Sequence, residues 1–126
     1  MANFAKDRNA KITLALGDNF YNVGVTSVTD QRFESTFENV FDKDILTDFR
    51  VLAGNHDHNG NVTAQVSYSQ KSGRWNFPSL YYDFHVSKNG KDVHFVFIDT
   101  VLLTGNSDVV EENVVVKERT GRELSD

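Results

Sequence analysis

The sequence contains no cysteine, one proline and one methionine among its 126 residues. Without cysteine the chain forms no disulfides and no thiolate metal sites, and cysteine usage gives no information about its compartment. No apolar run approaches the length of a membrane span, and residues 1–10 lack the apolar core of a signal peptide. Any metal bound by this chain must therefore be held by oxygen and nitrogen ligands.

Positive charge is also scarce. Asp and Glu number 18 against 13 Lys and Arg, which gives a formal net charge of −5 and a pI of about 5.3. A surface for nucleic acid or for anionic lipid would need clustered Lys and Arg, so we expect neither nucleic acid nor a membrane as partner. If the ligand is an anion, a bound cation would have to supply the attraction.

Phenylalanine, in contrast, is abundant, with 10 copies in a chain that is 39% hydrophobic. This composition indicates a globular chain that buries aromatic rings, and its length suits one domain over residues 1–126. Four apolar segments predict strands: residues 11–16, 49–53, 81–86 and 93–98. Between the first two, Phe33, Phe37 and Phe41 recur at helical spacing after a Ser27-x-x-Asp30 capping pattern, which predicts a helix of roughly three turns.

A strand, a helix and a strand in this order predict a βαβ unit with parallel strands and a right-handed crossover. Residues 63–71 are a weaker helix candidate, and residues 74–79 read as an irregular aromatic loop. The Asn89-Gly90 dipeptide predicts an antiparallel hairpin between the last two strands. The expected fold class is therefore α/β, a βαβ unit followed by a hairpin, and residues 104–126 are expected to be a loop or frayed end.

Two strand candidates end in glycine and then in groups that bind cations or move protons. Gly17-Asp18-Asn19-Phe20-Tyr21 follows the first strand, and Gly54-Asn55-His56-Asp57-His58 follows the second. Because sites in α/β sheets gather at the carboxyl ends of strands, we expect the two segments to share one site.

The side chains of these segments have suitable chemistry. The oxygens of Asp18, Tyr21 and Asn55 could bind a metal, His56 could donate a proton to a leaving group, and Asp57 could orient an imidazole. The alternative is that Asp18 caps a turn beside a half-buried Tyr21, and that the second segment is a polar turn with solvated histidines. The unusual Gly-Asn-His-Asp string at a strand end favours a functional site.

Other candidate residues have simpler expected roles. His85 and His94 lie within predicted strands and are expected to be packed or surface residues rather than ligands, and Asp99 is expected to form a turn. His58 lies beside the second segment without being required by it. Asn61-Val62-Thr63 is a candidate N-glycosylation acceptor, which counts only if the protein is secreted.

The two segments together resemble the metallophosphoesterases, and Tyr21 narrows the resemblance to the purple acid phosphatases. Further strings are similar to the small animal-type, tartrate-resistant subgroup: Leu52–Gln65, Arg74-Trp75-Asn76-Phe77-Pro78, Asp99-Thr100 and Gly105-Asn106-Ser107-Asp108. The likeness runs from about residue 11 to about residue 108. It implies a partial calcineurin-like β-sandwich flanked by helices.

The resemblance also implies a chemistry. Phosphate monoesters, as small molecules or phosphoproteins, would be hydrolysed at acidic pH by a hydroxide activated at a dinuclear centre of Fe(III) with Fe(II) or Zn(II). Asp18 would match the bridging carboxylate, Tyr21 the phenolate on Fe(III), and Asn55 the amide ligand of the divalent metal. His56 would contact the phosphate and assist the leaving group, and Asp57 would support it.

The resemblance is incomplete. The family has an aspartate ligand in a Gly-Asp strand upstream of Gly17 and histidine ligands in downstream Gly-His segments, and nothing here matches them. We therefore expect a fragment whose parent enzyme is secreted or lysosomal, with doubtful activity in this chain. The alternatives are another metallophosphoesterase, acting on diesters or nucleotides, and a truncated, non-catalytic product.

Overall fold

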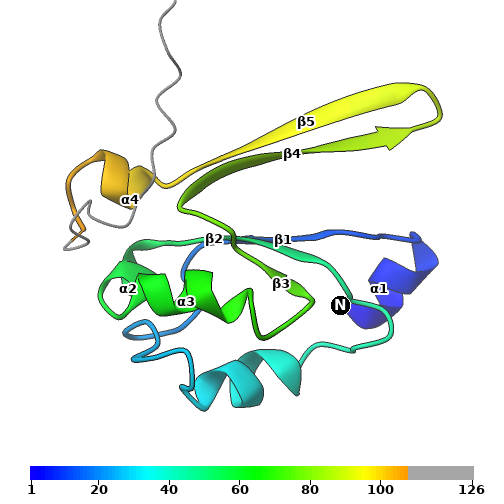
Figure 1. The fold of residues 1–126 in the computed structure, drawn as a ribbon. Helices are drawn as coiled ribbons and strands as arrows, with labels where there is room; N and C mark the ends of the chain where they lie inside the picture. The colour runs from blue at the N-terminus through cyan, green and yellow to red at the C-terminus, as the bar shows by residue number, and fades with distance from the viewer. Residues whose placement is uncertain (108–126) are drawn as a thin grey trace, which may run out of the picture.

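The computed structural model describes residues 1–107 (Figure 1). A short helix, α1 (Ala2–Asp7), precedes strand β1 (Thr13–Leu16), and β2 (Phe49–Leu52) and β3 (Trp75–Asn76) follow. These strands form one parallel sheet in the order β1-β2-β3, with Thr13 opposite Phe49 and Leu16 opposite Leu52. The parallel pairing of the first two predicted strands is confirmed, and the aromatic loop expected at residues 74–79 contributes the short third strand.

The crossover between β1 and β2 is less helical than predicted. Only Phe33–Glu38 forms a helix, the wide, π-type η1. The carboxylate of Asp30 instead accepts hydrogen bonds from the Thr26 amide and from the backbone and side chain of Arg32. Because this bonding closes a turn over residues 26–32, the helix starts at Phe33, later than the Ser27-x-x-Asp30 capping pattern predicts.

An aromatic core lies between the parallel sheet and the helices on one of its faces. Phe33 of η1 stacks on Tyr68 of α3 (Val62–Tyr68) with ring centroids 3.7 Å apart, and Phe37 meets Trp75 edge to face at 4.8 Å. All four rings are buried. Burying an aromatic side chain contributes on the order of 2 kcal/mol, so this cluster holds the sheet and helices together.

The other face of the sheet carries the hairpin of β4 (Tyr81–Lys88) and β5 (Lys91–Ile98) (Figure 1). Asn89 and Gly90 turn it, both with positive φ, as the dipeptide predicted. Tyr82 donates a hydrogen bond to the Val51 carbonyl at 2.8 Å, and the Arg50 guanidinium lies over the Phe84 ring. The hairpin is thus a second, two-stranded layer, which gives the partial β-sandwich that was expected.

A last helix, α4 (Thr100–Leu103), follows β5 and is capped by Asp99, whose carboxylate accepts the Leu102 amide hydrogen bond at 2.9 Å. The loop expected over residues 104–126 begins as a turn at Thr104 and Gly105, and residues 108–126 lie outside the described part. Within residues 1–107, no helix is long and apolar enough to span a membrane.

Candidate metal centre

The ends of β1 and β2 meet where the two segments leave the sheet. A Cβ atom added to Gly54 would lie 2.3 Å from Asp18 Oδ1, and one added to Gly17 would lie 3.0 Å from the Gly54 backbone. Gly17 also has a φ of +95°. Both positions therefore require glycine, and this close approach brings the two predicted segments together at one edge of the sheet.

Asp18 and Tyr21 present their oxygens to each other. The Tyr21 hydroxyl donates a hydrogen bond to Asp18 Oδ2 at 2.8 Å, and the His56 amide donates to Asp18 Oδ1 at 3.2 Å. The Tyr21 hydroxyl is the main cause of the lowered pKa of the Asp18 carboxyl. The same bond raises the pKa of Tyr21, because the phenol then donates to a carboxylate.

Asn55 and His56 lie beside this pair, in the first turn of α2 (Asn55–His58). The side chain of Asn55 is exposed, and the residues on either side of it contact Asp18. The His56 ring lies 4.5 Å from the Tyr21 ring, and its Nδ1 bonds the carbonyl of Asn22. The structure therefore brings together four of the predicted site residues, Asp18, Tyr21, Asn55 and His56.

Asp57 points the other way. Its side chain is fully buried and accepts hydrogen bonds from the amides of Asn19, Phe20 and Gly54. The Gln65 amide side chain also donates to it, at 2.8 Å. Its observed partners are thus backbone amides and amide side chains rather than the imidazole that the sequence suggested, and they tie the two segments together from inside.

Sequence reasoning missed Asn19 and Gln65. The Asn19 side chain donates to the Leu52 carbonyl at 2.9 Å and to Asp57 at 3.2 Å. Gln65 is fully buried on α3, where a polar side chain requires partners. The sequence did offer a signal for Gln65, since a glutamine on the apolar face of a short helix indicates a buried side chain with polar partners.

The loop between Tyr21 and η1 is also held by hydrogen bonds from the Arg32 side chain. Arg32 donates to the carbonyls of Val23 and Gly24 at 2.6 and 2.8 Å, and the Gly24 amide donates to the His56 carbonyl at 2.7 Å. A Cβ on Gly24 would lie 2.5 Å from the Asp57 carbonyl oxygen. The backbone on both sides of the candidate centre is therefore held in place.

His58 and Asp99 form a buried pair next to the centre. The His58 Nε2 atom lies 2.7 Å from Asp99 Oδ2, and Nδ1 lies 2.7 Å from the Ser107 hydroxyl. Asp99 is fully buried and also caps α4. Both residues have structural contacts, which attach the segment after β5 to α2; Asp99 was expected only to form a turn, and its pairing with His58 was not predicted.

Asn61 is the N-cap of α3. Its side-chain oxygen accepts the Ala64 amide at 2.9 Å and the Thr63 hydroxyl at 2.7 Å. The residue is exposed, and its amide nitrogen donates to the Thr26 carbonyl at 3.4 Å. Glycosylation of Asn61 stays a prediction.

The oxygen atoms of Asp18, Tyr21 and Asn55 are of the kind that bind a hard metal cation. Carboxylate, phenol and amide oxygens are the ligands preferred by iron and other hard metal ions, and those of Asp18 and Tyr21 are already within hydrogen-bonding distance. These ligand atoms therefore fit part of a metal coordination sphere. They are too few to close one around two ions.

No family model matches the chain. Among curated proteins, it is 49% identical over 112 residues to tartrate-resistant acid phosphatase type 5 of Sus scrofa, covering 86% of this chain and 33% of that protein. The corresponding Homo sapiens protein is 50% identical over 103 residues, covering 79% and 32%. Purple acid phosphatase 3 of Arabidopsis thaliana is 30% identical over 128 residues, covering 95% and 34%. The chain spans about a third of the length of these relatives.

A solved structure has a similar fold. The protein described as GAP50, the anchor in the inner membrane complex of Plasmodium, superposes with a TM-score of 0.71 at 28% sequence identity. The match covers 83% of this chain and 36% of that one. It supports the interpretation of the two sheets as part of a metallophosphoesterase fold.

Proposed function

Since this chain is related along most of its length to the tartrate-resistant acid phosphatases, and more distantly to the plant purple acid phosphatases, we propose that it carries one part of a metal-dependent phosphate monoesterase site. The observation that carries the proposal is the convergence of Asp18 and Tyr21 with Asn55 and His56 at the ends of β1 and β2. Sequence similarity to a phosphatase alone would leave the site residues undefined. Their convergence gives each of them a possible role.

Asp18, Tyr21 and Asn55 would hold metal. An ionised carboxylate and a phenolate suit Fe(III), and the neutral amide oxygen of Asn55 suits a divalent neighbour, Fe(II) or Zn(II). When bound, such ions supply Lewis acidity toward water and toward a phosphoryl oxygen. Their charge would also draw a phosphate ester to a protein whose own net charge is −5.

His56 would serve the substrate. Because its Nδ1 bonds the Asn22 carbonyl, that nitrogen carries a hydrogen, and Nε2 is the atom left to face a ligand. A protonated imidazole can hold a phosphoryl oxygen and pass its proton to the leaving oxygen as the P–O bond breaks.

Asp57 would act as a positioning residue. It contacts the amides of Asn19, Phe20 and Gly54, which lie next to the proposed ligands in the chain. A shift of these amides would move Asp18 and Asn55 together. Asp57 would therefore fix the positions of the proposed ligands by holding the backbone next to them.

The proposal is tested by Fe(III) titration of the purified chain with absorption in the visible range. A phenolate on Fe(III) absorbs there, so the wild type should develop a band that Tyr21→Phe abolishes. Tyr81→Phe is the matched control, because Tyr81 lies in β4 and its hydroxyl contacts only the Asp99 carbonyl among the contacts observed. A band that persists unchanged in Tyr21→Phe would overturn the proposed ligand set.

Hydrolysis of 4-nitrophenyl phosphate tests what this chain does alone. With Fe and Zn added we expect negligible turnover, because Asp18, Tyr21 and Asn55 leave the coordination of two ions incomplete. Multiple turnover that Asp18→Ala abolishes would contradict this expectation and show that the chain is itself an active phosphatase.

A second candidate is a non-catalytic role. The structural relative from Plasmodium is described as the anchor in the inner membrane complex. By analogy, this chain would act as an interaction module. Its identity of 28% is well below the values near 50% to the acid phosphatases, which therefore weigh more. Absence of metal binding in the titration above would favour this candidate. A diester or nucleotide substrate has no specific support among the described residues.

A further inference from the structure

The outer face of the β4–β5 hairpin carries two histidines and a carboxylate in one cluster. His85 and His94 are direct cross-strand partners with ring centroids 4.0 Å apart and ring planes 12° apart. The His94 Nε2 atom lies 2.7 Å from Asp83 Oδ2, and His85 Nε2 lies 4.0 Å from the same oxygen. One ligand atom from each residue lies within 4.8 Å of the others.

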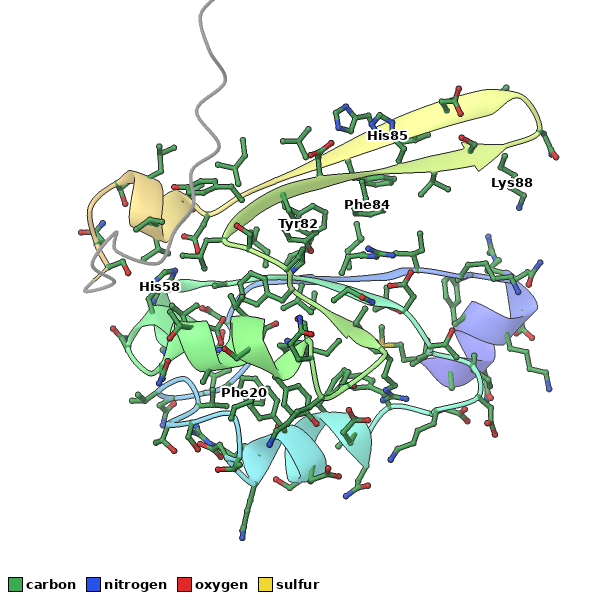
Figure 2. The ribbon with its side chains drawn as sticks, viewed as in Figure 1. Phe20, His58, Tyr82, Phe84, His85 and Lys88 are labelled. Atoms are coloured by element: carbon green, nitrogen blue, oxygen red, sulfur yellow. The ribbon has the colours of Figure 1, made fainter. Side chains whose placement is uncertain are left out.

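Local structure explains why these three side chains meet. Side chains alternate between the two faces of a strand, so Asp83 and His85 share one face of β4. Tyr82 and Phe84 point to the other face, toward the parallel sheet, whereas His85 points away from it (Figure 2). The register set by the two-residue turn then places His94 opposite His85.

The spacing is close to that of a coordinated ion. Around a tetrahedral ion with bonds of about 2.0–2.1 Å, ligand atoms are about 3.3 Å apart. The observed separations from the Asp83 oxygen, 2.7 and 4.0 Å, bracket this value. Small side-chain rotations would therefore suffice, and the strand pairing already fixes the backbone.

We propose that Asp83, His85 and His94 form a surface site for a divalent transition metal of the Zn²⁺ or Cu²⁺ class. Two imidazoles with one carboxylate are a ligand set that such ions prefer over Mg²⁺ or Ca²⁺. The three side chains are roughly half exposed, at 58%, 62% and 45%, so water completes the coordination. Asp83 and His94 also line an open hollow of about 500 Å³ together with Tyr81 and Val96, through which a hydrated ion reaches them.

This site is separate from the candidate centre at the ends of β1 and β2. It shares no residue or strand with that centre, and it does not depend on the proposed phosphatase function. Its effect is expected to be local. An ion bound there links β4 to β5 and stabilises a hairpin that has only two strands.

The test is calorimetric titration of the full 126-residue chain with Zn²⁺. To separate the two sites, the titration is repeated in an Asp18→Ala/Asn55→Ala variant, which removes ligands of the candidate centre. The hairpin site should persist in that background as one binding event per chain. Loss of the event in that background, in a variant that remains folded, would assign the Zn²⁺ to the other centre and overturn the proposal.

Variants of the hairpin complete the test. His94→Ala should weaken Zn²⁺ binding at least tenfold, and Asp83→Asn by a smaller factor. Asp92→Asn is the matched control, because the Asp92 carboxylate lies on β5, as His94 does, and bonds the Ser87 hydroxyl rather than a histidine. With Cu²⁺ as probe, the electron paramagnetic resonance spectrum should show coupling to two nitrogens in the wild type and to one in His94→Ala. An unchanged affinity or spectrum in His94→Ala would refute the site.

Discussion

The ends of β1 and β2 and the outer face of the β4–β5 hairpin both collect possible ligands, but they hold them differently. At the strand ends, buried Asp57 and the Asp30–Arg32 pair hold the backbone on both sides of the proposed ligands. On the hairpin, register and side-chain alternation alone bring His85 and His94 together. The first arrangement depends on tertiary contacts and the second on local geometry. Substitutions should therefore cost very different amounts of stability in the two regions.

The largest effect is expected at Asp57. Asp57→Ala leaves the buried amides of Asn19, Phe20 and Gly54 without their acceptor, and unsatisfied buried donors cost about 1–3 kcal/mol each. Because neighbouring losses are not additive, we expect a total on the order of 3–5 kcal/mol. Urea unfolding followed by the fluorescence of the buried Trp75 measures it.

Asp44→Ala is the control for that measurement, since Asp44 is an exposed carboxylate and its loss should cost less than about 0.5 kcal/mol. Similar unfolding midpoints for the two variants would mean that the buried network does not brace the strand ends.

An intermediate, pH-dependent effect is expected at Asp30. The Arg32 guanidinium beside it holds the pKa of the Asp30 carboxyl well below its usual range, and the side chain is only 10% exposed. A lowered folded-state pKa gives a contribution that is complete above the unfolded value of about 3.9, declines below it, and is lost as pH falls through the folded-state pKa. Asp30→Asn should therefore cost about 1–2 kcal/mol at pH 7 and much less near pH 2. Unfolding of both proteins at the two pH values tests this, and an equal cost at both would show that charge is not the cause.

The smallest effect is expected on the hairpin. In a chelating buffer, His85→Thr or Asp83→Asn should change the free energy of unfolding by less than about 0.5 kcal/mol, because exposed ion pairs contribute little. Thermal unfolding in chelator measures the cost of each substitution, and added Zn²⁺ should then raise the midpoint of the wild type more than that of either variant. A cost in chelator as large as that of Asp57→Ala would show that the hairpin face is braced like the strand ends.

Much of the fold could be predicted because the relevant signals are local. Apolar runs ending in glycine marked β1 and β2, and Asn89-Gly90 marked the hairpin. The helix before β2 was predicted in the right place but too long, because Asp30 bonds Thr26 and Arg32 and closes a turn where the capping pattern put the helix start. A competing side-chain bond of this kind leaves no trace in the apolar periodicity.

At the candidate site, the sequence indicated which residues converge but not which way each one faces. In a helical turn, consecutive side chains are about 100° apart, so His56 and Asp57 point in different directions once α2 forms. The string alone does not show that α2 exists, and Asp57 was therefore placed beside the imidazole. His85 and His94, in contrast, are equally far from the Asn89-Gly90 turn, and counting outward from it would have paired them.

The hydrogen bond between Tyr21 and Asp18 would make metal binding at the proposed centre an exchange of a proton for a cation. The carboxylate stays ionised and the phenol keeps its hydrogen, because each favours that state in the other. A cation that takes the phenolate oxygen must expel this hydrogen into solution, so each ion bound there releases one proton. The proton of Tyr21 would thus compete with the cation for this oxygen, and tenfold more acid should make the same cation bind about tenfold more weakly.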